Sequence, residues 1–392
     1  MINYLVQTFT EDIEPDQTTR FYHLIVMMFG TLYPTRSNSC REIGATIPGS
    51  PDGSNLNDSL RNHPEFYEVI FLSVLYSSII WMVQKSKPGT PIYLSLDDTF
   101  IPKSRKQKSL AFAYYCGHKK GHGFYVVAGH LQIGKYHLPL GFRIYYPKSG
   151  VSKQTLAIKI LQEVAPMLTG FHKITVLTDS GYADQALMKY VNDELGWSWL
   201  SGIKCNRCLS GKAVEACFRY ISNGEYIPLL LYKRHFLVTS LIGFLNGFKE
   251  SGLFIASKTK KSYKPVSWRY YYSSDTSLTV REALERYSNR WRIENDFWTL
   301  KEQLNMNEFV FHKEDVVKAY LHVVYTTYMW VCHTKNEQVC RKRSSTIPYG
   351  TGEIITELRN QLKEHFFQHG EQSIQVILEE FMKKRLQRTQ RE

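Results

Sequence analysis

The order of strand-like and helix-like segments between residues 92 and 192 constrains the fold more than any other feature of the sequence. A short apolar strand, a β-hairpin, a helix, a second apolar strand and a second helix follow one another. Such an order is typical of strands and helices in separate layers around a sheet, so the sequence predicts an α/β fold. In chain order, the segments are residues 92–96, 124–133 and 137–146 (joined at Gly134-Lys135), 152–168, 173–178 and 185–192.

The segments further along the chain extend this pattern. Residues 197–204 and 268–272 are expected to be further strands, and residues 279–304 to form one long helix. The whole order matches a ribonuclease H-like catalytic core interrupted by a β-rich insertion, with a helical N-terminal domain and a helical C-terminal tail. The expected domains are residues 1–88 (helical), 89–205 (core, first part), 206–267 (insertion), 268–345 (core, second part) and 346–392 (helical C-terminal region).

The N-terminal domain contains a candidate DNA-binding unit. A helix is expected over residues 18–32, and two shorter helices, 39–45 and 55–62, flank a turn rich in Gly, Pro and Ser. Two short helices around a turn suggest a helix-turn-helix, whose second helix would enter a major groove of DNA. A small helical cap is the alternative interpretation.

The charge balance and the cysteines limit the partners. Lys and Arg number 49 and Asp and Glu 36, which leaves a formal net charge of +13. This surplus favours a polyanionic partner such as nucleic acid, although a basic surface also serves solubility. The seven scattered cysteines do not suggest a disulfide framework, and the Cys205-x-x-Cys208 pair lacks a second, suitably spaced pair of zinc ligands.

The apolar runs indicate buried helices rather than membrane spans. Residues 1–10 lack the basic start and apolar core of a signal peptide. The runs 69–83 and 319–332 are too short to cross a bilayer. We therefore expect a soluble protein of the cytoplasm.

Residues 287–301, YSNRWRIENDFWTLK, form the most informative segment. On a helix with roughly 100° per residue, the side chains of Tyr287, Arg290, Glu294 and Lys301 fall within an arc of about 60°. An apolar stripe lies beside this arc, so the helix can pack on a sheet while its flank presents a carboxylate. Arg290 and Lys301 are placed to hold phosphates, and Tyr287 to hydrogen-bond one. An ordinary surface pair of Arg and Glu is the alternative.

Two further carboxylates are expected at the ends of strands. Asp97 and Asp179 each follow a short apolar strand, where an acidic side chain suits a site better than a core. Two Asp and one Glu can hold two Mg²⁺ ions, or Mn²⁺ in their place, because these ions prefer oxygen ligands. Such a pair activates an attacking oxygen and stabilises a leaving one. The predicted catalytic and metal-binding residues are therefore Asp97, Asp179 and Glu294.

These motifs resemble those of one family. The spacing Tyr287-x2-Arg290-x3-Glu294-x6-Lys301 is similar to the Y-R-E-K signature of cut-and-paste insertion-sequence transposases of the DDE type, in the insertion-sequence-four group. Residues 96–99 (LDDT) and 178–184 (TDSGYAD) resemble the first and second acidic motifs of that family. The resemblance covers about residues 92–330. The long gap before the Glu also fits, because this group carries a β-rich insertion there.

The resemblance implies a DNA transposase that acts on the ends of its own element. The expected chemistry is hydrolytic nicking, release of the element (in this group often through a hairpin at its end) and strand transfer into target DNA. The three acids are implied as metal ligands, and Tyr287, Arg290 and Lys301 as contacts to DNA near the cleaved phosphate. The expected partners are double-stranded DNA, as terminal inverted repeats and target, and a second copy of the chain in a homodimer on DNA. The expected setting is the prokaryotic nucleoid.

The first acidic motif holds two adjacent acids, Asp97 and Asp98. Side chains alternate across a strand, so only one of them can face the site. The motif of the family places a Thr two residues after the ligand, here Thr99, which favours Asp97.

Basic and aromatic residues near these motifs are candidate DNA contacts. A basic loop leaves the strand of Asp97, and contact with phosphates is predicted there, with a solvated loop as the alternative. Hairpin-forming relatives stack a flipped base on an aromatic residue, although core packing also accounts for each Trp near the insertion. The basic residues are Lys103, Arg105, Lys106 and Lys108, and the aromatic ones Trp197, Trp199 and Trp268.

Two other functions fit the same acids. A ribonuclease H-like nuclease would cut DNA without joining it, and a DNA-binding protein descended from a transposase would do neither. The intact set of three acids argues against the second, and only an assay of strand joining separates the first from a transposase.

Overall fold

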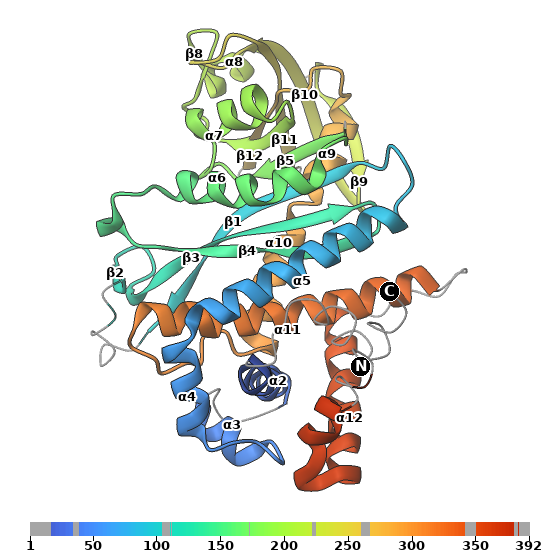
Figure 1. Ribbon diagram of the computed structural model, residues 1–392. Helices are drawn as coiled ribbons and strands as arrows, with labels where there is room; N and C mark the ends of the chain where they lie inside the picture. Colours follow the sequence, from blue (N-terminus) through green and yellow to red (C-terminus); the bar gives the residue numbers. More distant parts are fainter. Residues whose placement is uncertain are drawn as a thin grey trace.

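The structure is a computed structural model of the chain. It describes residues 17–33, 39–103, 110, 112–171, 173–221, 225–259, 267–341, 350–379 and 383. Figure 1 shows a mixed sheet with helices packed on it and a group of helices below it. The helices are α2 (Thr18–Leu32), α3 (Cys40–Thr46), α4 (Gly53–Asn62), α5 (Pro64–Lys85), α6 (Lys153–Val164), α7 (Gln185–Lys189), α8 (Val214–Arg219), α9 (Val280–Ser288), α10 (Trp291–Trp298), α11 (Glu314–Arg341) and α12 (Thr351–His369).

The described strands form a ten-stranded mixed sheet and a separate two-stranded ribbon, β7 with β8. From one edge the order is β2-β3-β1-β5-β6-β12-β11-β10-β9, and β4 also pairs with β3. β1, β5 and β6 are parallel neighbours. The strands are β1 (Ile92–Pro102), β2 (Tyr114–Cys116), β3 (Gly121–Ile133), β4 (Tyr136–Tyr145), β5 (Ile174–Thr178), β6 (Ser198–Ile203), β7 (Cys208–Leu209), β8 (Lys212–Ala213), β9 (Ile227–Leu231), β10 (Arg234–Phe244), β11 (Ser251–Thr259) and β12 (Ser267–Ser273).

The predicted hairpin is confirmed, whereas the first strand is longer than expected. β3 and β4 pair antiparallel, and Gly134 in their turn has a φ of 56°, which a residue without Cβ adopts without strain. β1 does not end before Asp97, because it pairs with β3 as far as Pro102. Its pairing with β5 does stop at Leu96. Asp97 therefore lies in the part of β1 that still pairs with β3 but no longer pairs with β5.

Residues 206–267, expected as a β-rich insertion, add strands to the same sheet. β12 returns beside β6, as predicted. β11, β10 and β9 then continue the sheet outward by antiparallel pairing. Figure 1 shows these strands, together with α8, in the upper part of the molecule.

Successive side chains of β1 point to opposite faces of the sheet, and each face is covered by a helix. Gly129, opposite Leu96, lies against α6, since a Cβ on Gly129 would stand 3.1 Å from Ile160. Asp97, the next residue along β1, points to the other face. There Arg290, which directly precedes α10, reaches its carboxylate.

The helix predicted over residues 279–304 is interrupted between α9 and α10. The side-chain amide of Asn289 donates to two carbonyl oxygens of the preceding turn. It thus competes for acceptors that a continuous helix would use. Tyr287 consequently lies on one helix and Glu294 on the next, so the single predicted arc is divided between two elements.

The helical regions at both ends of the chain share one core with the sheet. α2 has the predicted bounds, and the two short helices of the N-terminal unit are present as α3 and α4. α3 and α4 approach closely, because a Cβ on Gly44 would stand 2.8 Å from the backbone nitrogen of Gly53. α2, α5 and α12 pack against α11.

α5 is longer than its apolar run suggested. Residues 69–83 were expected to be too short to cross a bilayer, but α5 spans 22 residues and is long and apolar enough to do so by length and composition alone. Half of that stretch is buried inside the protein. Phe71 and Ile79 are among its buried residues, and they join the core that includes α11.

Candidate active site

Asp97 and Asp179 are neighbours at the point where two parallel strands stop pairing. The register of β1 and β5 ends at Leu96 opposite Thr178, and the two acids are the next residue along each strand. The Asp97 side chain is only 16% exposed. Its burial, and then the nearby charge of Asp179, raise the pKa of Asp97 to about 7.

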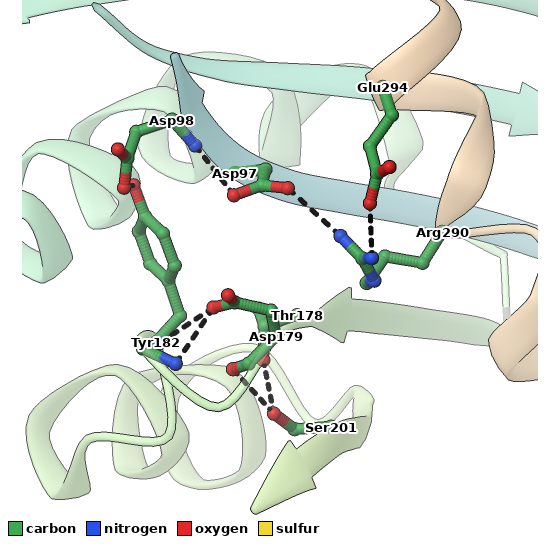
Figure 2. A network of polar contacts seen from close by, with 9 residues as sticks. Asp97, Asp98, Thr178, Asp179, Tyr182, Ser201, Arg290 and Glu294 are labelled. Carbon is green, nitrogen blue, oxygen red and sulfur yellow. Dashed lines mark hydrogen bonds and ion pairs between the residues drawn. The ribbon is translucent and has the colours of Figure 1, made fainter. Parts of the chain in front are cut away.

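A tight turn after β5 holds the Asp179 carboxylate. Its Oδ1 accepts the backbone N–H groups of Gly181 at 2.8 Å and Tyr182 at 3.3 Å. A Cβ on Gly181 would stand 3.1 Å from the same Oδ1, so a side chain there would crowd the carboxylate. The Ser201 hydroxyl donates to the carbonyl oxygen of Asp179 at 3.0 Å and ties the turn to β6 (Figure 2).

Arg290 joins Asp97 to Glu294. Its Nη1 donates to Asp97 Oδ2 at 2.9 Å, and its Nη2 donates to Glu294 Oε1 (Figure 2). The Arg290 side chain is 12% exposed and that of Glu294 33%, so the cation is the more enclosed partner. Arg290 thus connects Asp97 of β1 with Glu294 of α10, and Asp179 at the end of β5 lies beside Asp97.

Asp98 points away from this group. Its Oδ2 accepts Lys153 Nζ at 2.8 Å, and its Oδ1 accepts the Tyr182 hydroxyl at 3.1 Å. Lys153 also lies 3.4 Å from the ring centroid of Tyr125. Sequence reasoning missed Lys153, although it directly follows Ser152, the residue whose hydroxyl caps α6. Of the two adjacent acids, Asp97 is the one beside Arg290.

The acidic cluster, defined as Asp97, Asp179 and Glu294, offers the ligand type that Mg²⁺ and Mn²⁺ prefer, since every donor is a carboxylate oxygen. In this conformation the guanidinium of Arg290 stands between two of the acids. No three His, Cys, Asp or Glu side chains among the described residues converge closely enough to hold a metal ion. The ligand type of the three acids therefore suits divalent metal ions, but their spacing in this structure does not, and Arg290 lies between Asp97 and Glu294.

Tyr287 lies at the border of the acidic cluster. Its ring meets that of Tyr271 edge to face at 4.9 Å between centroids. A Cβ on Gly202 would stand 3.1 Å from the Tyr287 hydroxyl, so the glycine leaves room for it. Burial raises the pKa of Tyr287 to about 12, and the phenol therefore stays protonated at neutral pH.

Lys301 contacts the backbone of β1 rather than the carboxylates of the acidic cluster. Its Nζ donates to the carbonyl oxygen of Phe100 at 2.8 Å. Burial, and then the charge of Lys119, lower the pKa of Lys301 to about 8. The residue lies in a π-helical turn, Thr299–Gln303, which shifts it from the position it would have on a regular α-helix.

Lys103, a predicted phosphate contact, has its ammonium turned inward in this structure. Its Nζ donates to the carbonyl oxygens of Asn307 at 2.7 Å and Phe309 at 3.3 Å, and lies 3.2 Å from the centroid of the Phe309 ring. Burial lowers the pKa of Lys103 to about 7. The ammonium faces inward because carbonyl groups 204 and 206 residues further along the chain supply acceptors there. The other predicted contacts, Arg105, Lys106 and Lys108, lie outside the described residues.

The tryptophans bordering the proposed insertion differ in exposure. Trp199 is fully buried, as core packing predicts, whereas Trp268 is 38% exposed. Trp268 lies parallel to Tyr270 with 6.3 Å between ring centroids. Cys205 and Cys208 are free, and the described part of the chain gives them no metal-ligand group.

A cavity of about 1060 Å³ lies beside the two short N-terminal helices. Residues of α3, of α4 and of the segment that leads into α11 line it. Three of these residues are basic and well separated in sequence, namely Arg41, Arg61 and Lys313. The cavity thus places positive charge on the unit that sequence reasoning selected as a candidate for DNA binding.

The chain belongs to the family described as Transposase DDE domain, whose model matches residues 88–330. That range contains the whole acidic cluster, and by family the protein is a DDE transposase, a class that uses divalent metal ions. Among solved structures, a piggyBac transposase synaptic complex with hairpin DNA, determined by cryo-EM, is similar at 13% identity and a TM-score of 0.48. The similarity covers 96% of this chain and 74% of that one. No curated protein matches the chain.

Proposed function

We propose that this transposase moves an insertion sequence by cut and paste, through metal-dependent cleavage of DNA strands followed by strand transfer. Asp97, Asp179 and Glu294 are its catalytic residues and hold two Mg²⁺ or Mn²⁺ ions. It acts on the terminal inverted repeats of its element and on target DNA as a homodimer, in the cytoplasm at the prokaryotic nucleoid. Its place is in the insertion-sequence-four group.

The observation that carries the proposal is that Asp97, from a distant part of the chain, lies beside Asp179 and is linked to Glu294 through Arg290. One cation balances only part of the charge of these three carboxylates, which costs folding energy unless a positively charged ligand completes the site. The raised pKa of Asp97 is the expected sign of such a site.

The residues around the acidic cluster have distinct tasks in this proposal. Metal ions bound there would activate an attacking oxygen and stabilise a leaving oxygen. The turn after β5 holds Asp179 in one orientation through two backbone N–H groups. Arg290 pairs with two acids in the free protein, and once released it can bind a phosphate through two parallel hydrogen bonds.

Two residues of the proposed Y-R-E-K signature would also contact the DNA strand that is cut. Tyr287 presents a protonated phenol at the edge of the acidic cluster, suited to donate to a phosphate oxygen. Lys301 is held at the end of β1 by Phe100. Transfer of a phosphoryl group asks mainly for position and charge stabilisation, which these side chains supply.

The strand order supports a ribonuclease H-like core. Three strands, β4, β3 and β1, are antiparallel, and β5 and β6 continue the sheet in parallel with β1. α6, which follows β4 in the chain, packs on one face of the sheet, and the Glu-bearing α10 lies on the other. β9, β10 and β11, added beyond β12, correspond to the proposed insertion.

The N-terminal helices are proposed to contact the ends of the element. The cavity beside α3 and α4 carries Arg41, Arg61 and Lys313, and the whole chain has a net charge of +13. Phosphate contacts of this kind position a protein on DNA without reading its sequence.

A strand-transfer assay tests the proposal. Purified protein is mixed with duplexes from the two ends of the DNA that flanks its gene, pre-cut to expose a 3′-OH, and with a target plasmid in Mg²⁺ or Mn²⁺. We expect ends joined to the plasmid, which sequencing of the junctions identifies. Cleavage of uncut ends without any joined product would reduce the protein to a nuclease.

Two variants test the assignment of the acids. Asp179→Asn and Glu294→Gln keep the shape of each side chain but remove its charge. We expect both to bind the end duplexes in a mobility-shift assay while cleavage and joining are lost. Full activity of either variant would show that the acid is not catalytic.

A further inference from the structure

A buried carboxylate that the proposed chemistry does not use lies next to the acidic cluster. Asp296 is 4% exposed and stands two residues after Glu294 on α10. Removing a carboxylate from water is costly unless it is fully hydrogen-bonded. Its presence therefore calls for a structural or functional reason.

Asp296 connects α10 to both of its supports. Its Oδ2 lies 2.5 Å from Nδ1 of His130 on β3, and its Oδ1 accepts the Tyr328 hydroxyl of α11 at 2.7 Å. Both partners are only 1% exposed. With the carboxylate ionised, His130 Nδ1 is the donor, so each carboxylate oxygen has one enclosed donor.

The two acids of α10 flank its buried stripe. Ile293 and Phe297 point into the core. At 100° per residue, Glu294 lies roughly 80° to one side of their mean direction and Asp296 roughly 80° to the other. Rotation of α10 about its axis in either direction therefore lifts one of the two carboxylates away from its partners.

Both carboxylates are also connected to the same pair of strands, β1 and β3. Glu294 reaches Asp97 of β1 through Arg290. Asp296 reaches His130, which pairs with Ser95, two residues before Asp97 on β1. The β1–β3 register thus fixes the distance between the two points at which α10 is held.

We propose that Asp296 is a positioning residue which, with His130 and Tyr328, sets the rotation of α10 and hence the place of Glu294 relative to Asp97 and Asp179. The inference rests on the proposed function, because it takes Glu294 as a metal ligand. Asp296 itself touches neither metal nor DNA. A merely structural role would affect folding stability without changing the affinity of the site for metal.

Metal binding separates these two roles. Mn²⁺ affinity is measured by electron paramagnetic resonance on the full chain, beside the thermal midpoint of unfolding and the rate and KM of cleavage of an end duplex. We expect Asp296→Ala to weaken Mn²⁺ binding at least about tenfold, as loss of a partner that orients a metal ligand does. Asp296→Asn, which retains a weaker set of hydrogen bonds, should rescue part of this loss. The rate should fall while KM for DNA stays unchanged.

Two tyrosines of α11 supply a matched pair. Tyr328→Phe removes the donor to Asp296, whereas Tyr325→Phe removes a buried hydroxyl for which the described residues offer no partner. We expect weaker Mn²⁺ binding in the first and wild-type binding in the second. This pair keeps the test open should Asp296→Ala fail to fold.

The outcomes also separate this inference from the proposed function. Variants of Asp296 and Tyr328 that unfold at lower temperature yet bind Mn²⁺ and cleave like the wild type would overturn the positioning role alone. A wild-type chain that neither binds Mn²⁺ nor cleaves would overturn the proposed function and this inference with it.

Discussion

Two adjacent acids of β1, Asp97 and Asp98, have opposite electrostatic surroundings. Asp98 is fully paired, with Lys153 at 2.8 Å and the Tyr182 hydroxyl at 3.1 Å. Asp97 shares Arg290 with a second acid and faces Asp179, and its burial and that like charge raise its pKa to about 7. Asp98, as a structural carboxylate, thus has a cation and a hydroxyl donor of its own. Asp97, as a proposed ligand, shares its cation with another acid.

The largest expected effect is on activity. Asp97→Asn should lower the cleavage rate about a thousandfold or more, because a metal ligand contributes several kcal/mol to the barrier. Asp98→Asn should change it by less than about tenfold, because the backbone N–H of Asp98 that donates to Asp97 Oδ1 is retained. Cleavage of an end duplex under single-turnover conditions measures both. Equal losses in the two variants would contradict separate roles.

The sequence predicts that Asp97 and Asp98 differ, but it does not predict which residues pair with them. Alternation along a strand requires Asp97 and Asp98 to face opposite ways, and apolar runs before Asp97 and Asp179 predict adjacent strands. The side of each acid depends on tertiary contacts, which sequence spacing does not encode. Arg290 and Lys153 lie 193 and 55 residues from the acids they bind.

Local competition and distant acceptors account for two features that the sequence did not predict. The amide of Asn289 interrupts a helix that its apolar period would continue. Lys103 has the sequence context of a surface loop, yet carbonyl groups of Asn307 and Phe309 draw it inward. Periodicity thus predicted the strands well and the environment of individual cations poorly.

The second largest effect is on the pH dependence of stability. Unfolded Asp97 has a pKa of about 4, so between about pH 4 and 7 the folded protein holds a proton that the unfolded chain has lost. This contribution to stability is complete below about pH 4 and is lost as the pH rises to about 7. Relative to Asp97→Asn, the metal-free wild type should lose at most about 4 kcal/mol over that range.

Denaturant unfolding from about pH 4 to pH 8, in the presence of a chelator, measures this difference. Asp98→Asn is the control, because it keeps the Asp97 carboxyl with Asp179 and Arg290 beside it and removes only the smallest of the causes that raise the pKa of Asp97. Parallel stability curves for the wild type and Asp97→Asn would contradict the raised pKa of Asp97.

A smaller effect is expected on stability at neutral pH from the paired acid. Asp98→Asn leaves the Lys153 ammonium without its carboxylate partner, beside the rings of Tyr125 and Tyr145. The Lys153 and Asp98 side chains are 24% and 15% exposed, so we expect a loss of about 1–2 kcal/mol in the free energy of unfolding. Glu215→Gln, which breaks an ion pair with Arg219 at the surface, should lower the free energy of unfolding far less. Similar losses in both would place Asp98 among ordinary surface pairs.

The smallest effect concerns Tyr182, the residue that connects the two surroundings. Its hydroxyl donates to Asp98, but its backbone N–H donates to Asp179 at 3.3 Å. Tyr182→Phe removes only the first of these bonds, so we expect a loss of about 0.5–1.5 kcal/mol in the free energy of unfolding and a cleavage rate within about threefold of the wild type. A large loss of cleavage with little change in stability would show that the contacts of Asp98 affect the acidic cluster. Asp97 and Asp98 would then not have separate roles.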